Sequence, residues 1–117
     1  MTEVGGEPFA GFIRDLPMAD SPLASLRGWL IGGEQALAMF YEIADGVEVP
    51  AHAHGAQWGV VLEGSVEFTI GDETRMYRRG DTYYVPDGVV HAAVISPGYV
   101  GIDVFADADR YAARRST

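Results

Sequence analysis

Short runs of apolar or alternating residues, separated by turn residues, recur along the chain from Ser25 to Phe105. Side chains on a β-strand alternate between two faces with a period of two, so runs of this kind predict strands. The shortest turns, Glu63-Gly64 and Gly71-Asp72, predict hairpins or tight strand links. The predicted strands cover residues 25–31, 36–43, 58–62, 66–70, 74–78, 82–85, 89–95 and 99–105. Many short, evenly spaced strands are typical of an all-β sandwich or barrel.

The two ends of the chain differ in composition from the predicted strands. Residues 1–24 are rich in glycine, proline, aspartate and alanine, and we expect an N-terminal arm there with one edge strand. After Phe105, Asp107 is suited to cap a helix and the segment ends in arginines, which predicts a short C-terminal helix. No repeat or linker interrupts residues 25–117, which are predicted to form a single barrel domain.

Composition excludes several classes of function. The chain has 117 residues, 48% of them hydrophobic, which suffices for one globular domain. A formal net charge of −9 argues against binding to nucleic acid or to anionic membranes. Cysteine and lysine are both absent, which excludes disulfides, thiolate ligands and Schiff-base chemistry on a lysine. With no signal-like start and no apolar run long enough to span a membrane, a cytoplasmic location is expected.

The three histidines of the chain are His52, His54 and His91. On a strand, His52 and His54 project to the same side, and His91 belongs to a different predicted strand. Imidazoles that converge from two strands are a common ligand set for transition metals. A His-X-His pair alone is weak evidence, because alternating polar residues on a strand usually form only its solvated face. A lone histidine such as His91 is more often a hydrogen-bonded residue than a ligand.

The histidines also lie in two segments with ordered glycines and a proline. In residues 46–64, five residues separate Gly46 from His52-Ala-His54, and a polar residue follows at position 57, seven before the final glycine. In residues 80–91, five residues separate the first glycine from Pro86-Asp-Gly88, and His91 follows two residues later. This arrangement resembles the two sequence motifs of the cupin superfamily over about residues 35–105. The resemblance implies a jelly-roll β-barrel (double-stranded β-helix) with a metal ion inside.

The same resemblance implies a ligand set of His52, His54, Gln57 and His91. In the family a glutamate precedes the glycine by seven positions, whereas glutamine stands here, one residue closer to the histidine pair than usual. Ile95 also replaces the family's asparagine. Gln57 is expected either to ligate the ion or to orient a histidine or water beside it. The sequence does not choose among divalent Ni, Fe, Zn, Mn and Cu.

A second group of candidate residues follows on the last predicted strand. Asp103 and Phe105 share one face of it and Ile102 and Val104 the other, so Asp103 is a candidate general acid or base if that face is buried. The Asp-Val-Phe segment followed by Arg110 resembles the small cupins of pectin degradation, which ketonise unsaturated uronates and also use a glutamine ligand. That resemblance implies Asp103, Phe105 and Arg110 as catalytic residues. The structural alternative is an ion pair between Asp103 and Arg110.

These observations favour a metal-dependent enzyme that moves a proton on a small oxygen-rich substrate, as a sugar-acid isomerase or lyase does. Two alternatives remain open: a metal-dependent dioxygenase similar to quercetinases, and a non-catalytic barrel that binds a small molecule. No organic cofactor is implied.

The expected partners are a small-molecule substrate and a second copy of the chain. Cupin barrels often pair through an edge strand or the arm, so the resemblance predicts a homodimer. Aromatic residues are expected mainly in the core or at a dimer contact, with one or two lining the pocket. The residues concerned are Trp29, Phe40, Tyr41, Trp58, Tyr83 and Tyr84.

Overall fold

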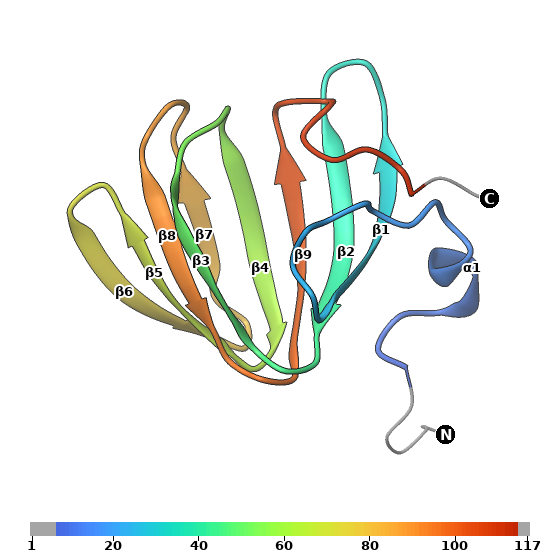
Figure 1. The fold of residues 1–117 in the computed structure, drawn as a ribbon, viewed down its shortest axis with the longest axis horizontal. Helices are drawn as coiled ribbons and strands as arrows, with labels where there is room; N and C mark the ends of the chain where they lie inside the picture. Colours follow the sequence, from blue (N-terminus) through green and yellow to red (C-terminus); the bar gives the residue numbers. More distant parts are fainter. Residues whose placement is uncertain (1–6, 115–117) are drawn as a thin grey trace.

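The computed structural model describes residues 7–114, which form one short helix and two antiparallel sheets (Figure 1). The elements are α1 (Gly11–Arg14), β1 (Leu26–Gly32), β2 (Leu37–Ile43), β3 (Val47–His52), β4 (Gln57–Glu63), β5 (Ser65–Ile70), β6 (Glu73–Arg78), β7 (Thr82–Val85), β8 (His91–Ile95) and β9 (Tyr99–Phe105). The five-stranded sheet has the order β1-β2-β9-β4-β7 and the four-stranded sheet the order β3-β8-β5-β6. The all-β jelly roll is therefore confirmed, and each predicted strand matches an observed one to within two residues.

The core lies between the two sheets and is built by alternation along strands such as β2, β4 and β8. The sequence left open which face of residues 36–43 looks inward. Met39 and Tyr41 are buried in the core, whereas Phe40 and Glu42 point to the other side of β2. Each large apolar side chain buried in this way contributes about 1.5–3 kcal/mol, so the alternation fixes the strand register.

The two tight turns have different roles. Gly71 has a φ of 63° and Ile70 pairs with Glu73, so Gly71-Asp72 closes the β5–β6 hairpin. Gly64 has a φ of 81° and joins β4 to β5, which belong to different sheets. The turn at Gly71-Asp72 is therefore a hairpin, and the turn at Glu63-Gly64 is a tight link between the two sheets, so each takes one of the two predicted forms. Both conformations favour glycine because a Cβ is disfavoured at positive φ.

The N-terminal segment packs on the outer side of the five-stranded sheet. Residues 7–24 form α1 and isolated β-bridges at Met18 and Ala19 in place of the expected edge strand, and the first six residues lie outside the described part of the chain. Phe9 stacks edge-on against Trp29 and Phe40, at centroid distances of 6.1 and 5.7 Å. This aromatic contact anchors the segment.

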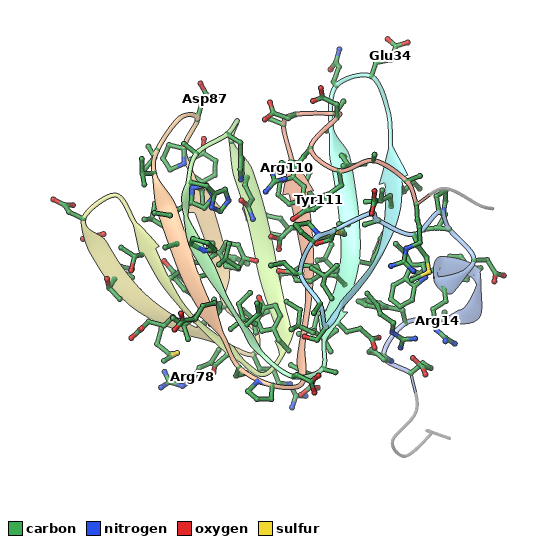
Figure 2. The ribbon with its side chains drawn as sticks, in the orientation of Figure 1. Arg14, Glu34, Arg78, Asp87, Arg110 and Tyr111 are labelled. Atoms are coloured by element: carbon green, nitrogen blue, oxygen red, sulfur yellow. The ribbon has the colours of Figure 1, made fainter. Side chains whose placement is uncertain are left out.

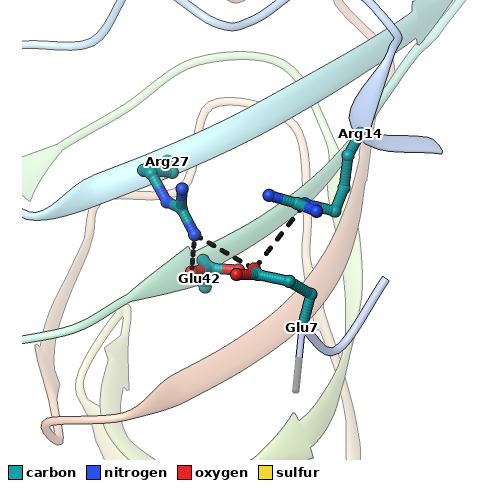
Figure 3. A network of polar contacts seen from close by, with 4 residues as sticks. All are labelled: Glu7, Arg14, Arg27 and Glu42. Carbon is teal, nitrogen blue, oxygen red and sulfur yellow. Dashed lines mark hydrogen bonds and ion pairs between the residues drawn. The ribbon is translucent and has the colours of Figure 1, made fainter. Parts of the chain in front are cut away.

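Ion pairs also connect the N-terminal segment to β1 and β2 (Figure 3). Glu7 pairs with Arg14 at 3.6 Å and with Arg27 at 3.2 Å, and Arg27 also pairs with Glu42 at 2.7 Å. The carboxylates raise the pKa of Arg27, chiefly through its hydrogen bond with Glu42. Because three of the four side chains are a third or more exposed, solvent screens these pairs and they orient the segment more than they stabilise it.

The short helix expected from Asp107 is not formed, and that prediction is wrong. Residues 106–114 form turns and end in a bridge between Ala113 and Ala19. The carboxylate of Asp107 accepts a hydrogen bond from the backbone N–H of Gly55 at 2.8 Å, so it is engaged outside its own segment. This contact ties the C-terminal segment to the loop after β3. Within the described residues, no helix is long and apolar enough to cross a membrane.

Candidate metal centre

The three histidines meet at one end of the barrel. His52 is the last residue of β3 and pairs directly with His91, the first residue of β8. His54 lies in the loop beyond β3, so the expectation that it shares a strand with His52 is wrong. The loop nevertheless brings it to the others, with ring centroids 5.1 Å from His52 and 4.7 Å from His91. One ligand nitrogen from each ring lies within 4.8 Å of the other two.

Backbone carbonyls fix the tautomer of each ring. The Nδ1 atom of His52 lies 2.9 Å from the carbonyl oxygen of Pro50. The Nδ1 atoms of His54 and His91 lie 2.8 Å from the carbonyl oxygens of Gly55 and Val89. Because a carbonyl can only accept, each Nδ1 must carry the proton and donate it. Each Nε2 therefore keeps a free lone pair, which is the form that binds a metal ion.

The distance between two of these lone pairs fits a shared cation. The Nε2 atoms of His54 and His91 are 3.1 Å apart, and neither has a proton to place between them. Both nitrogens could therefore bind one ion with bonds of about 2.1 Å. Burial lowers the pKa of both His54 and His91, so both rings are neutral near neutral pH, as metal binding requires.

Gln57 lies on the cavity wall beside the histidines. It is the first residue of β4, is buried, and lines the same cavity as all three rings. Its amide Nε2 donates to the Oδ2 atom of Asp103 at 2.5 Å. The amide nitrogen is thus held by a carboxylate, and the carbonyl oxygen is the atom left for another partner. This orientation fits the oxygen ligand expected from the sequence.

Asp103 is fully buried and surrounded by hydrogen-bond donors. Its Oδ1 atom accepts from the hydroxyl of Tyr83 at 2.5 Å and from that of Tyr41 at 3.3 Å, while Oδ2 accepts from Gln57. Burial raises the pKa of Asp103 to about 6, and the three hydrogen bonds oppose that rise. These donors occupy the carboxylate in place of Arg110, so the alternative of an Asp103–Arg110 ion pair is wrong.

Phe105 and Arg110 line the cavity together with the histidines. Phe105 packs against His54, with ring centroids 5.9 Å apart. The guanidinium of Arg110 lies over the rings of Phe105 and Tyr111, 5.6 and 4.5 Å from their centroids, and Figure 2 shows Arg110 and Tyr111 at the same end of the barrel. The buried Nε of Arg110 has no hydrogen-bond partner among the described residues. An unpaired guanidinium beside a cavity is suited to bind an anionic group.

All seven residues predicted for the site line one cavity of about 70 Å³. Since one water needs about 10–15 Å³ by this measure, there is room for a compact polar group rather than a large apolar ligand. Sequence reasoning missed Tyr99 and Tyr111, which also line it. The Tyr99 hydroxyl is buried without a partner among the described residues, and burial raises the pKa of Tyr99 to about 12. Its inward position followed from strand alternation, but nothing in the sequence marked it as part of the site.

Gly59 is another residue that the sequence did not single out. In the register it lies between Asp103 of β9 and Tyr83 of β7. A Cβ on Gly59 would overlap the Asp103 carboxylate and the Tyr83 hydroxyl, so only glycine leaves room for their hydrogen bond. The signal that could have found it is a glycine at an inward-facing position of a core strand.

Replacing Gly59 by alanine should therefore lower the free energy of unfolding by about 1–3 kcal/mol, the usual cost of overpacking a core. Urea denaturation measures this change. Gly33→Ala is the matched control, because a Cβ there meets nothing within 4 Å. Equal stability of both variants would contradict the close packing of Tyr83 and Asp103 around Gly59.

Fold and site together define a small jelly-roll barrel with a cluster of metal-ligating side chains inside it. The chain belongs to the family described as Cupin domain, which it matches over residues 39–98. The matched region contains all three histidines and Gln57. The resemblance seen in the two histidine segments is therefore confirmed at the level of the family.

Solved cupin structures resemble the chain over most of its length. An RmlC-like cupin from Shewanella frigidimarina shares 27% identity, covers 90% of this chain and 95% of its own, and gives a TM-score of 0.74. KdgF from a Halomonas species shares 23% identity, with 95% and 96% covered and a TM-score of 0.70. An oxalate decarboxylase from Bacillus subtilis shares 22% identity, with 83% and 29% covered and a TM-score of 0.66. Among curated proteins, none matches the sequence.

Proposed function

We propose that the protein is a metal-dependent enzyme that transfers a proton on a small sugar acid, in an isomerase- or lyase-type reaction. One observation carries the proposal: a single cavity is lined by three histidines, the buried carboxylate of Asp103 and Arg110, whose buried Nε has no hydrogen-bond partner among the described residues. A purely structural barrel has little use for this combination, because it places a buried carboxylate among neutral donors and leaves the buried Nε of Arg110 without a partner among the described residues.

His52, His54 and His91 would hold the ion through Nε2, with the carbonyl oxygen of Gln57 as the fourth ligand. All four ligands are neutral, so a bound divalent ion would keep its full charge and act as a Lewis acid toward substrate oxygens. Nitrogen-rich ligation with one oxygen suits Ni, Fe, Zn, Mn or Cu. The lone pairs that converge from His54 and His91 support this assignment on the geometry of the chain itself.

The other residues would bind the substrate and move its proton. Arg110 would hold a substrate carboxylate, since it lines the cavity with the histidines and its Nε donor is unpaired within residues 7–114. Phe105 would supply the apolar wall that keeps Arg110 in place and excludes water from the histidines. Asp103 would accept or return the proton, because its carboxylate reaches the cavity while Tyr83 and Tyr41 hold it in one orientation.

The sugar-acid substrate rests on the resemblance to small cupins of pectin degradation. The Asp-Val-Phe segment and Arg110 carry that resemblance, and KdgF from a Halomonas species has the same fold. A cavity of about 70 Å³ is consistent with a monomeric substrate whose reacting end enters the barrel. We therefore propose unsaturated monouronates as the substrates to test first.

The test is an assay of the purified protein, loaded separately with Ni, Fe, Zn, Mn and Cu, against unsaturated monouronates. Turnover is followed by loss of the ultraviolet absorbance of the ring double bond, and the ketonised product is identified by NMR. Metal-dependent loss of that absorbance supports the proposal. Oxygen consumption with a flavonol or diketone would point instead to a dioxygenase. Binding of the monouronate without turnover would point to a non-catalytic barrel.

Replacing Arg110 by methionine should raise KM for a monouronate by about 10–100-fold, the effect of losing a charged contact of about 1.5–3 kcal/mol. The change in kcat should be small, because Arg110 would hold the carboxylate in both the bound and the reacting state. Steady-state kinetics measure the two constants. Arg79→Met is the matched control, since Arg79 is exposed and does not line the cavity. A fall in kcat alone would contradict the assigned role.

A further inference from the structure

One carboxylate outside the cavity is tied to the metal centre. Asp107 follows β9, does not line the cavity, and accepts a hydrogen bond from the backbone N–H of Gly55 at 2.8 Å. Gly55 comes directly after His54, in the loop between β3 and β4. In Figure 1 this loop and the segment after β9 lie at the same end of the barrel. The bond therefore joins two parts of the chain that are 52 residues apart, beside a predicted metal ligand.

The backbone of Gly55 connects Asp107 to the ring of His54. Its N–H is held by the carboxylate, and its carbonyl oxygen accepts the proton on Nδ1 of His54 at 2.8 Å. That second bond leaves the Nε2 lone pair of His54 free for a cation. A histidine that binds a metal commonly donates its other ring N–H to a backbone carbonyl, and this partner sets the orientation of the ring. Here the carbonyl belongs to a loop, so the loop itself must be held in place.

His54 needs this support more than the other two histidines do. His52 and His91 pair with each other as residues of β3 and β8, so the sheet fixes the backbone of both. His54 lies in the loop beyond β3 and has no strand pairing of this kind. Its place therefore depends on the contacts of the loop.

Within residues 7–114, three hydrogen bonds from other parts of the chain hold this loop. The backbone N–H groups of Gly88 and Ala106 donate to carbonyl groups of the loop, at 2.9 and 2.8 Å. The third bond is the one from Gly55 to Asp107. It is the bond of the three that uses a side chain, so a substitution can remove it and leave the backbone contacts in place.

The carboxylate and the loop also fit closely. A Cβ on Gly55 would overlap the Asp107 carboxylate, so glycine leaves the carboxylate room to reach the N–H. The segment that carries Asp107 is itself anchored, because Ala113 forms a bridge with Ala19. The residue before Ala19 forms a bridge with Trp29 of β1. Asp107 is thus held by the five-stranded sheet, as a residue that fixes a loop must be.

The charge of Asp107 has little direct effect on His54. Burial lowers the pKa of His54, and the hydrogen bond with the Gly55 carbonyl opposes that shift more strongly than the charge of Asp107 does. The carboxylate therefore acts on the ring mainly through the backbone of Gly55.

We infer that Asp107 is a positioning residue for the metal centre: its carboxylate fixes the backbone of Gly55, and that backbone orients the ring of His54 for the ion. The inference rests on the three-histidine site of the proposed function. Asp107 itself touches neither the ion nor the substrate in this assignment. Without it the loop would be free to move, and ordering the loop again on metal binding would cost conformational entropy and therefore affinity.

Replacing Asp107 by alanine should lower the affinity for Zn²⁺ by about 10-fold, the lower end of the range for residues that support a metal ligand. The lower end is expected because Asp107 acts through Gly55 and not on the ring itself. Asp107→Asn removes the charge but keeps an acceptor oxygen. A neutral hydrogen bond has about half the strength of a charged one, so this variant should lose only about 3-fold. Competition with a chelating dye measures the affinities on the full chain.

Asp81→Ala is the matched control. The carboxylate of Asp81 accepts a hydrogen bond from the backbone N–H of Arg78, also at 2.8 Å, and neither residue lines the cavity. The control therefore loses the same charge and the same kind of bond. Its affinity for Zn²⁺ should equal that of the wild type.

NMR of the metal-free proteins gives a readout that needs neither the ion nor a substrate. In Asp107→Ala the amide proton of Gly55 should exchange about 10–100-fold faster, as expected for the loss of a hydrogen bond to a charged group. The ring of His54 should no longer hold a single tautomer, because its carbonyl partner is no longer fixed. The rings of His52 and His91 should keep theirs, which separates loss of positioning from a general loss of stability.

The possible outcomes separate this inference from the proposed function. If the wild type binds Zn²⁺ and Asp107→Ala binds it equally well, this inference alone is wrong. An equal loss in Asp107→Asn and Asp107→Ala would assign the effect to charge and would also overturn it. A wild-type chain that binds no Zn²⁺ would overturn the three-histidine site and the inference together. No measurement here uses a monouronate, so failure of the proposed reaction would leave the inference standing.

Discussion

Replacing His52 by alanine is expected to remove the bound metal ion and, with it, turnover of the substrate. The wild-type protein should hold about one ion per chain, as a three-histidine site does. Removing a residue that only hydrogen-bonds to a metal ligand lowers metal affinity by about 10–100-fold. Removing a ligand itself should therefore lower the affinity by about 100-fold or more. Elemental analysis after dialysis and a competition titration with a chelating dye measure the stoichiometry and the affinity.

His52 is the best of the three histidines for this test because it is only partly buried and ends a strand. Its removal should therefore leave the barrel folded, which thermal unfolding of the metal-free protein will show. Glu48→Gln is the matched control, since Glu48 lies on the same strand and points to solvent. Unchanged metal content in the His52→Ala protein would show that the ion, if any, binds elsewhere.

The sequence predicted the histidine cluster better than it predicted the path of the chain around it. The prediction that His52 and His54 project to the same side assumed that both lie on one strand, but β3 ends at His52. The rings still converge because backbone carbonyls within two residues orient each of them. A local motif of this kind survives a wrong assignment of secondary structure, since the carbonyls and the rings belong to the same short segment.

The strands were predictable because most of them alternate against a common core, as β2, β4 and β8 do. The two terminal segments were not, because their conformations depend on contacts with residues far away in the sequence. Asp107 reaches back to the N–H of Gly55, and Phe9 packs on Trp29 of the five-stranded sheet. Neither contact leaves a signal in the local pattern. The importance of Gly59 likewise appears only when β4 is placed between β9 and β7.

Asp103 was expected from the sequence to move a proton, and the structure adds a second role for it. Its carboxylate accepts a hydrogen bond from the side-chain amide nitrogen of Gln57 and so orients the glutamine carbonyl oxygen away from Asp103. A residue that acts only in this way is a positioning residue. Proton transfer and positioning predict different results for the same substitutions.

Replacing Asp103 by asparagine should lower kcat for a monouronate by about 100- to 10,000-fold, the usual range for loss of a general base. The Asn side chain can still accept from Tyr83 and Tyr41, so the fold should persist. Its new amide group would face the amide of Gln57, however, and two donors cannot bond to each other. Some loss of metal affinity is therefore expected in addition, and metal content must be measured alongside kcat.

A double-mutant cycle with Gln57→Ala separates the two roles. If Asp103 moves the proton, Asp103→Asn should lower kcat in the Gln57→Ala background by nearly the same factor as in the wild type, measured at saturating metal. If Asp103 only orients Gln57, the second substitution should have no effect once the glutamine is gone. Tyr83→Phe is the matched control, because it removes the shortest hydrogen bond to Oδ1 and keeps the carboxylate. Its effect on kcat should be much smaller than that of Asp103→Asn, and an equal loss would assign the activity to the orientation of the carboxylate rather than to its basicity.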